Sequence, residues 1–217
     1  MTGQNDKRLQ VTIYVLLVVY VLNFLDRQIV GILAEPISRE LGLSDTQIGL
    51  MTGIAFALFY TGLGIPIARY CDRPTTSRVK VIAVCLAIWS AMTALCGAAQ
   101  NFAQMFLARI GVGIGEAGGT PPAHSLIAEM AAPEKRASAL SFYQLGPPIG
   151  GMIGLILGGM LADSIGWRWA FVLVGAPGVL LALVVVLVLR DPRQDVATTA
   201  APPEARHGGI LREFGEA

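Results

Sequence analysis

Charged residues are scarce in this 217-residue sequence: Asp, Glu, Lys and Arg make up 14% of it, against about 25% in an average globular chain. The formal net charge is only +1, which gives no reason to expect nucleic acid as a partner. Three cysteines, Cys71, Cys85 and Cys96, form no CxxC pair and predict no disulfide scaffold. With 54% hydrophobic residues, the chain is too apolar to be disordered. What remains is a polytopic membrane protein.

Catalytic motifs are also lacking. No HExxH or GxSxG motif occurs, and the only histidines are His124 and His207. His124 precedes Ser125, but adjacent residues on a helix point about 100° apart and cannot form a nucleophile–base pair. A GxGxxG pattern occupies residues 113–118, yet no strand is predicted before it, so it does not indicate nucleotide binding. We therefore expect no enzyme activity, no cofactor and no metal site.

Long uncharged stretches predict the membrane spans. A helix needs about 20 apolar residues to cross a bilayer, and the sequence predicts six such helices with short polar connections. The predicted spans are 9–34, 46–68, 79–99, 102–124, 137–162 and 167–190. The fold class is therefore an all-α membrane protein, with a six-helix transmembrane bundle over residues 1–190. Residues 191–217 are rich in Pro, Ala and charge, and they predict a cytoplasmic linker or disordered tail.

The distribution of Lys and Arg predicts the orientation. Six spans leave only Arg39 and Arg168 on one side of the membrane, and ten basic residues on the other. These ten are Lys7, Arg8, Arg69, Arg73, Arg78, Lys80, Lys135, Arg136, Arg190 and Arg193. Because cytoplasmic loops carry the excess of basic residues, both termini are predicted to be cytoplasmic. The first span carries Asp26 and no A-x-A site, so it is not a cleaved signal peptide. Trp167 and Trp169 are typical of an outer interfacial belt.

Four ionisable residues fall inside predicted spans: Asp26, Arg27, Arg109 and Glu116. Charge in the bilayer core costs at least about 2.5–3.5 kcal/mol per residue, and such residues usually mark an ion or substrate route. Asp26 lies about 12 Å below the outer end of the first span, and Arg109 about 10 Å below the outer end of the fourth. Since the depths match, we predict that Asp26 and Arg109 lie at hydrogen-bonding or one-water distance.

Glu116 follows Arg109 by seven residues, so both side chains project from one face of the fourth span. Hydrocarbon disfavours the ionised carboxylate, which makes Glu116 a candidate proton carrier. For Arg27 the alternative is that it turns toward a neighbouring helix and simply balances the charge of Asp26. The alternative hypothesis is that all four charges are structural pairs that lock the helices together.

Glycines recur every four residues on two predicted spans, which permits close approach of helix backbones. They are Gly111, Gly115 and Gly119 on the fourth span, and Gly146, Gly150, Gly154 and Gly158 on the fifth. Prolines accompany them: Pro121 and Pro122 end the fourth span, and Pro147 and Pro148 interrupt the fifth. Breaks of this kind are typical of moving or cavity-lining helices.

Several segments, in this order, resemble the major facilitator superfamily of transporters, and in particular its spinster-like branch. They are VLNFLDRQIVGILAEPI (Val21–Ile37), GIPIARYCDRPTTSRVK (Gly64–Lys80), RIGVGIGEAGGTPPA (Arg109–Ala123), LGPPIGGMIG (Leu145–Gly154) and GWRWAFVLVGAPG (Gly166–Gly178). The second is similar to the superfamily's loop signature between helices two and three, although Ala68 replaces the usual Gly. The resemblance covers about residues 10–192 and implies the N-terminal half of a fold of two six-helix halves that works by alternating access.

The resemblance also implies roles for individual residues. Asp26, Arg109 and Glu116, with Arg27 beside them, correspond to a coupled charge network. Two further groups follow from the loop and helix-five motifs. The first group, a cytoplasmic latch that stabilises the outward-facing state, is Asp72, Arg73 and Arg78; the second, a helix-five hinge, is Gly146, Pro147, Gly150 and Gly151.

The expected function is proton-coupled transport of a small amphipathic or anionic organic solute, such as a lysolipid, across a bacterial inner membrane. A sugar-acid or drug exporter of the same superfamily is the alternative within the transporter class. A non-transporting half-bundle that binds or regulates a membrane partner is the alternative from another class. The sequence stops at Ala217, where the fold would continue into a seventh helix. We therefore expect a truncated chain, completed by a C-terminal six-helix half or by a second copy.

Overall fold

The computed structural model describes the backbone of residues 2–194 and the side chains of residues 6–54, 56–161 and 164–194. All regular secondary structure in this range is helical. The helices are α1 (Thr2–Ile32), α2 (Ala34–Leu41), α3 (Asp45–Gly49), the π-helical η1 (Leu50–Ile54), α4 (Ala55–Cys71), α5 (Arg78–Cys96), α6 (Phe102–Glu116), α7 (Thr120–Met130), α8 (Pro133–Tyr143), α9 (Gly146–Ser164) and α10 (Trp167–Val188).

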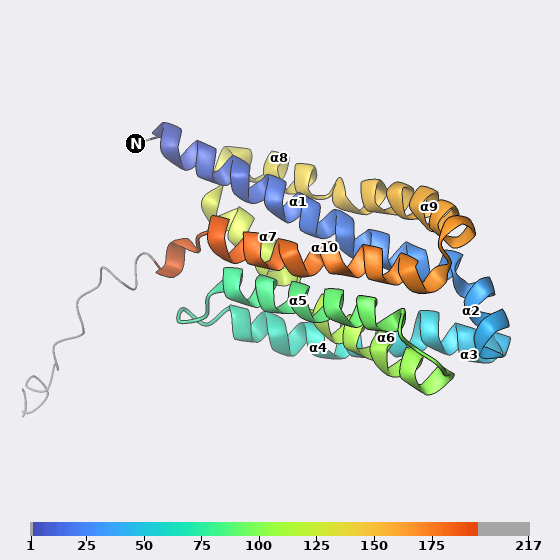
Figure 1. The fold of residues 1–217 in the computed structure, drawn as a ribbon. Helices are drawn as coiled ribbons and strands as arrows, with labels where there is room; N and C mark the ends of the chain where they lie inside the picture. Colours follow the sequence, from blue (N-terminus) through green and yellow to red (C-terminus); the bar gives the residue numbers. More distant parts are fainter. Residues whose placement is uncertain (1, 195–217) are drawn as a thin grey trace, which may run out of the picture.

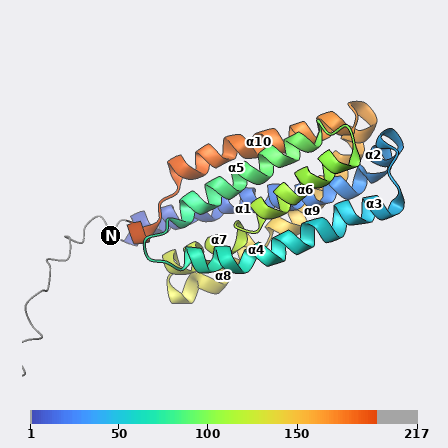
Figure 2. The same ribbon diagram turned by 90° about the horizontal axis from the view of Figure 1, so that it is seen from below.

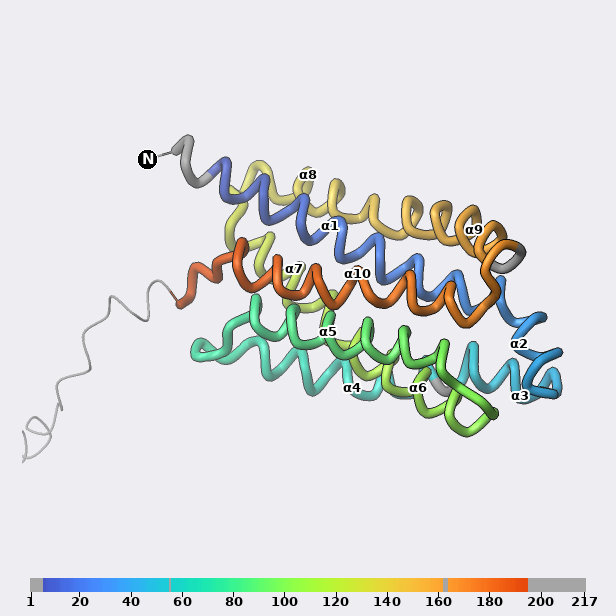
Figure 3. The backbone as a smooth tube through the Cα atoms, in the orientation of Figure 1, coloured from blue at the N-terminus to red at the C-terminus, as the bar shows by residue number. Residues whose placement is uncertain are grey.

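The long helices run roughly along one axis and form an elongated bundle (Figures 1 and 2). α10 packs chiefly against α5, α1 against α9, and α6 against both α5 and α4. The start of α1 and the end of α10 lie at the same end of the bundle, which we call the N-terminal end (Figure 3). α2 and α3 lie at the opposite end.

Five stretches of the described chain are long and apolar enough to cross a membrane. They are Asp6–Ile32, Asp45–Cys71, Arg78–Cys96, Pro133–Leu161 and Trp167–Gln194, and each overlaps a predicted span. Large apolar side chains cover the outer surface of these helices, with Leu187 82% and Leu180 66% exposed. Apolar exposure on this scale is expected of a surface that contacts lipid rather than water.

The fourth predicted span is a broken helix. α6 has 15 residues and is therefore about 22 Å long, less than the hydrocarbon thickness of about 30 Å. Asn101 caps its start by accepting a hydrogen bond from the Gln104 backbone N–H at 3.0 Å. The break falls at 117–119, just before Pro121 and Pro122, which occupy the first turn of α7. Proline suits a first turn because it has no N–H to leave unbonded there.

The predicted interruption of the fifth span is also present. α8 ends at Tyr143, and α9 begins at Gly146 with Pro147 and Pro148 in its first turn. Beyond α10, Asp191 is buried against the bundle. The predicted tail, 191–217, is described only as far as Gln194, and residues 195–217 lie outside the described part of the chain.

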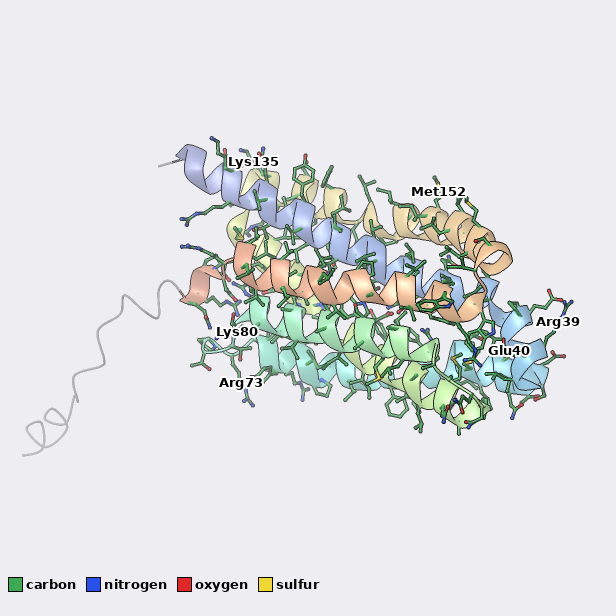
Figure 4. The ribbon with its side chains drawn as sticks, viewed as in Figure 1. Arg39, Glu40, Arg73, Lys80, Lys135 and Met152 are labelled. Carbon is green, nitrogen blue, oxygen red and sulfur yellow. The ribbon has the colours of Figure 1, made fainter. Side chains whose placement is uncertain are left out.

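A polar cluster ties α2 to α10 at the end of the bundle opposite the N-terminal end, where Figure 4 labels Glu40. Trp167 Nε1 donates to Glu40 Oε2 at 2.6 Å, and Arg168 Nε donates to Glu40 Oε1 at 3.0 Å. Arg168 Nη1 also donates to the carbonyl oxygens of Ala99 at 2.5 Å and Gly97 at 3.1 Å. The hydrogen bond from Trp167 and the Arg168 guanidinium hold the pKa of Glu40 below its usual value.

Candidate functional site

Asp26 and Arg109 form an ion pair between α1 and α6. Both are buried, at 2% exposure each, and Arg109 Nη1 lies 3.6 Å from Asp26 Oδ1. The predicted proximity of these two residues is therefore confirmed. Asp26 Oδ2 also accepts a hydrogen bond of 2.7 Å from Thr93 Oγ1 on α5, so three helices meet at this carboxylate. Thr93 was missed from the sequence, although it is one of two hydroxyl residues, with Ser90, within the apolar run of α5.

Arg27 and Glu116 form a second ion pair between the same two helices. Arg27 Nε donates to Glu116 Oε2 at 2.7 Å. The Glu116 side chain is completely buried, whereas that of Arg27 is 27% exposed. Arg27 thus turns toward a neighbouring helix, α6, where its ion-pair partner is Glu116. The four ionisable residues thus form two pairs, with one carboxylate and one guanidinium contributed by each helix.

Aromatic rings surround the Arg27 guanidinium. Its Cζ lies 5.1 Å from the ring centroid of Phe24, 4.6 Å from that of Phe56 and 4.7 Å from that of Tyr60. Arg109 Cζ lies 5.8 Å from the Phe56 ring as well. A cation over an aromatic face gains about 0.5–2 kcal/mol, so these rings hold Arg27 in place without neutralising it. Phe56 and Tyr60 were not foreseen, although a spacing of four on one helix places them on the same face.

Several atoms of the two pairs are not hydrogen-bonded. Within the described side chains, Asp26 Oδ1, Arg109 Nε, Arg109 Nη1 and Glu116 Oε1 are buried without a hydrogen-bond partner. A buried polar atom in this condition costs about 1–3 kcal/mol. The cluster therefore has unused hydrogen-bonding capacity that a proton or a change of ion-pair partner would satisfy.

Close glycine packing positions α6 against α5. A Cβ on Gly115 would lie 2.6 Å from the Trp89 backbone nitrogen, and one on Gly111 would lie 2.7 Å from the Met92 side chain. The spacing of four therefore has the packing role expected of it. These contacts bring α6 close to α5, and Arg109 and Glu116, which flank the two glycines, pair with residues of α1.

The predicted hinge residues lie where α9 packs on α1. A Cβ on Gly150 would lie 2.3 Å from the Val21 carbonyl oxygen, and one on Gly146 would lie 2.7 Å from the Tyr20 ring. At Gly151 the nearest atom to such a Cβ, in the Gln28 side chain, is 3.6 Å away, which is ordinary contact. Pro147 lies in the first turn of α9, so the break between α8 and α9 adjoins the helix that carries Asp26 and Arg27.

A second charged group lies at the N-terminal end of the bundle around Arg78, which has no exposed surface. Its backbone N–H and Nε donate to Asp191 Oδ2 at 2.7 and 3.1 Å, and its Nη2 donates to Asp191 Oδ1 at 2.5 Å. Arg78 Nη1 donates to Glu129 Oε2 at 2.8 Å and to Ser125 Oγ at 3.1 Å. Arg193 Nε donates to the same Glu129 oxygen at 2.9 Å. Arg78 thereby joins α5, α7 and the segment after α10.

The other two predicted latch residues do not join this group. Asp72 and Arg73 are exposed in the connection between α4 and α5, and neither forms an ion pair among the described residues. Arg73 lies over the Tyr70 ring, with its Cζ 5.6 Å from the centroid. Asp191 and Glu129 were not predicted as partners of Arg78, because they lie 113 and 51 residues away in the chain.

Metal-binding potential is low in the described part of the chain. There, no three His, Cys, Asp or Glu side chains gather in a way that could hold a metal ion. Cys71, Cys85 and Cys96 are buried as free thiols.

The sequence matches the family described as the Major Facilitator Superfamily over residues 16–213, so the chain belongs to that superfamily. Spinster proteins are among its relatives. The family membership points to transport rather than to enzyme catalysis.

Three relatives illustrate the range of this similarity. The chain is 41% identical over 205 residues to an MFS-type efflux pump of Mycolicibacterium smegmatis, covering 94% of this chain and 47% of the relative. It is 31% identical over 206 residues to a probable L-galactonate transporter of Escherichia coli, covering 94% and 45%. It is 29% identical over 195 residues to Protein spinster homolog 1 of Xenopus laevis, covering 88% and 36%. The chain thus spans about half the length of the relatives it matches, or less.

Crystal structures of a bacterial homologue of the human lysosomal transporter Spinster have a similar fold. The inward-facing, occupied form superposes with a TM-score of 0.80 at 42% identity, covering 84% of this chain and 44% of that chain. The inward-facing, unoccupied form gives a TM-score of 0.81 at 37% identity, covering 99% and 49%. The all-helical bundle is therefore a major facilitator fold.

Proposed function

We propose that this chain forms the N-terminal six-helix half of a proton-coupled secondary transporter, which moves a small amphipathic or anionic organic solute by alternating access. The observation that carries the proposal is the pair of buried ion pairs between α1 and α6, Asp26 with Arg109 and Glu116 with Arg27. Buried charge is costly in a membrane. In each ion pair, the carboxylate can bind a proton in place of its arginine partner. The other described helices contribute no comparable buried charge to the middle of the bundle.

The proposed topology has six spans with both termini in the cytoplasm. α6 and α7 together form the fourth span, with the break at 117–119 in its course. Basic residues labelled in Figure 4 support the orientation, because Arg73, Lys80 and Lys135 lie at the N-terminal end and the cytoplasmic side carries the excess of positive charge. The bacterial origin of two relatives supports a bacterial inner membrane.

In the proposed mechanism, protonation breaks one ion pair at a time. A proton on Glu116 releases Arg27. A proton on Asp26 releases Arg109, which can then pair with the carboxylate of Glu116 on the same face of α6. Each exchange changes the attraction between α1 and α6. A differential interaction of a few kcal/mol is enough to move the equilibrium between inward-facing and outward-facing states.

The substrate class follows from Arg27. Its side chain is partly exposed and bordered by Phe24, Phe56 and Tyr60, so a released guanidinium in this setting suits an anionic head group with an apolar body. A lysolipid-like solute fits this description. A sugar acid is the second candidate, favoured by the similarity to the probable L-galactonate transporter of Escherichia coli, and a drug-like solute is favoured by the similarity to an efflux pump.

A C-terminal six-helix half, or a second copy, would supply the other wall of the substrate cavity. Asp72 and Arg73, which are exposed at the N-terminal end, would meet that second half in the outward-facing state. The network of Arg78 with Asp191 and Glu129 would fix the base of this latch. The break before Pro147 and the close contact at Gly150 would let α8 and α9 bend as one hinge against α1.

The test is the pH dependence of transport by the complete transporter that contains this half. Cells or proteoliposomes are loaded with a lysophospholipid, L-galactonate or ethidium, and flux is measured with and without an imposed pH gradient. Glu116→Gln should abolish gradient-driven flux of the transported solute. The matched control is Glu35→Gln, an exposed acid at the other end of the bundle, which should transport normally. Flux by Glu116→Gln that still follows the pH gradient would overturn the proton-carrier role.

A further inference from the structure

A groove of about 300 Å³ lies at the N-terminal end of the bundle, between the start of α1 and the end of α10. Its lining combines three exposed cations with three apolar side chains, the latter being Val11, Met130 and Val188. The cations are Lys7, Arg8 and Arg190. No acidic residue lines the groove. This combination of excess positive charge with an apolar floor is unusual for a surface that only contacts water.

The described acidic residues next to the groove-lining residues in the chain are already engaged. Asp6 pairs with Lys135 at 3.3 Å, Asp191 pairs with the buried Arg78, and Glu129 pairs with Arg78 and Arg193. None of the three groove cations forms an ion pair with any described residue. Because the charges are close together and unbalanced, the groove attracts an anion.

Thr12 supplies a hydrogen-bond donor inside the groove. The residue lines the groove and is only 3% exposed. Its hydroxyl makes no hydrogen bond with any of the side chains or backbone that the structure describes, whereas Thr52 and Thr93 each donate to the carbonyl four residues earlier. A hydroxyl that lines a groove without a protein partner can donate to a ligand that brings an acceptor oxygen.

Further apolar side chains are exposed along the two helices that border the groove. Val11 and Val18 on α1 are 45% and 49% exposed, and Leu187 and Leu183 on α10 are 82% and 61% exposed. A ligand that satisfies the whole groove therefore needs an anionic head with acceptor oxygens and a long apolar body that follows these helices.

We propose that the groove binds an anionic phospholipid of the surrounding bilayer. Its phosphate lies among Lys7, Arg8 and Arg190, an ester or phosphate oxygen accepts the hydrogen bond of Thr12, and an acyl chain lies along Val11. The site differs from the proposed transport site and requires only that the bundle sits in a membrane. Nucleic acid or an acidic peptide would leave the apolar floor uncovered.

A neighbouring groove provides an internal contrast. It lies on another side of α1, against α8, and its cation Lys135 is paired with Asp6 in the same lining. Its charge is therefore balanced, and no lipid is assigned to it. Lys135 and the exposed Lys80, both at the N-terminal end in Figure 4, are matched control cations outside the proposed site.

The test is native mass spectrometry of the full chain in detergent, titrated with phosphatidylglycerol or with phosphatidylcholine. One lipid-facing cation contributes about fivefold to binding of an anionic lipid. Lys7→Gln, Arg8→Gln and Arg190→Gln should each weaken phosphatidylglycerol binding about fivefold, and together about 100-fold, with phosphatidylcholine binding unchanged. Thr12→Val, which keeps all charges, should weaken it severalfold. Lys80→Gln and Lys135→Gln should have no effect.

Three results would overturn the proposal. In the first, the triple variant binds phosphatidylglycerol as well as the unaltered chain. In the second, Lys80→Gln and Lys135→Gln weaken phosphatidylglycerol binding as much as the groove variants do. Positive charge anywhere at the N-terminal end of the bundle would then be enough to bind the lipid. In the third, glycerol 3-phosphate displaces phosphatidylglycerol at equal concentration, so that the apolar floor contributes nothing and the ligand is a soluble phosphate.

Discussion

Replacing Asp191 with Asn should destabilise the bundle, because Asp191 is the main partner of a completely buried arginine. Arg78 has no exposed surface and directs three N–H groups at the two Asp191 oxygens, over 2.5–3.1 Å. Asparagine keeps the size of the side chain, but it loses the negative charge and turns one acceptor oxygen into an NH₂ donor. That donor would face a guanidinium that can only donate.

The size of the effect follows from what remains around Arg78. Removing one partner of a buried ion pair costs about 3–5 kcal/mol. Glu129 still accepts from Arg78 Nη1 at 2.8 Å, although its side chain is 36% exposed and hence screened by solvent. We therefore expect the lower end of the range, about 3 kcal/mol, or about 160-fold in the unfolding equilibrium. For a chain of this size that corresponds to about 6–12 °C in melting temperature.

The three cysteines provide the assay. Because they are free and buried, a thiol-reactive fluorophore labels them only when the bundle opens, and its fluorescence on heating gives the melting temperature in detergent. Asp72→Asn is the control, since it removes the same charge from an exposed position that has no ion pair with a described residue. Equal melting temperatures for Asp191→Asn and Asp72→Asn would refute the structural role of the Arg78–Asp191 pair.

Two further stability predictions use the same assay. Gly150→Ala should lower the melting temperature, at a cost of about 1–3 kcal/mol, because the new Cβ would lie 2.3 Å from a carbonyl oxygen of α1. The control, Gly159→Ala, should be neutral or slightly stabilising, because a Cβ there has no atom within 4 Å. Equal melting temperatures for the two variants would contradict the close packing at Gly150. The pKa of Glu40 is lowered by the hydrogen bond from Trp167 and by Arg168, so its stabilising contribution is present above the ordinary glutamate pKa of about 4.3 and is lost as the pH falls through the lowered value. Between about pH 6 and pH 3 the unaltered chain should therefore lose more stability than Glu40→Gln, and parallel losses would show that the contact contributes nothing.

The pairing of Asp26 with Arg109 could be predicted because helix geometry alone determines depth. A fixed rise of 1.5 Å per residue converts distance from a span end into depth, and residues at equal depth on neighbouring helices can meet. The length that a bilayer requires of a crossing helix also led to six predicted spans, and five of them overlap stretches that are long and apolar enough to cross a membrane. The glycine spacing likewise predicted close approach of helix backbones, which the structure has between α9 and α1.

The partner of Arg27 could not be predicted in this way. Adjacent residues point about 100° apart on a helix, so Arg27 cannot share the environment of Asp26, but its direction depends on how α1 is rotated in the bundle. That rotation is set by packing chiefly against α9 and also against α10, α8 and α7, which the sequence of α1 does not contain. Phe56 and Tyr60, which hold the guanidinium, come from α4.

Contacts at the two ends were the least predictable. Counting basic residues on each side of the membrane treats Arg78 as one exposed charge among ten, whereas it is buried and bonded to a residue 113 positions away. Trp167 and Trp169 look equivalent in the sequence as interfacial anchors. In the structure Trp169 is 63% exposed, whereas Trp167 is 3% exposed and donates to Glu40.

The most direct test of the central claim is to detect protonation of the buried carboxyls by infrared difference spectroscopy of the chain in a lipid bilayer. Exposed carboxylates titrate near pH 4, so a step from about pH 8 to about pH 6 leaves them ionised. We expect this step to produce a protonated-carboxyl band that shifts in D₂O, weakens in Glu116→Gln, and disappears in the double variant with Asp26→Asn. Glu35→Gln should leave the band unchanged. No band, or one that persists in the double variant, would contradict the assignment of these ion pairs to proton coupling.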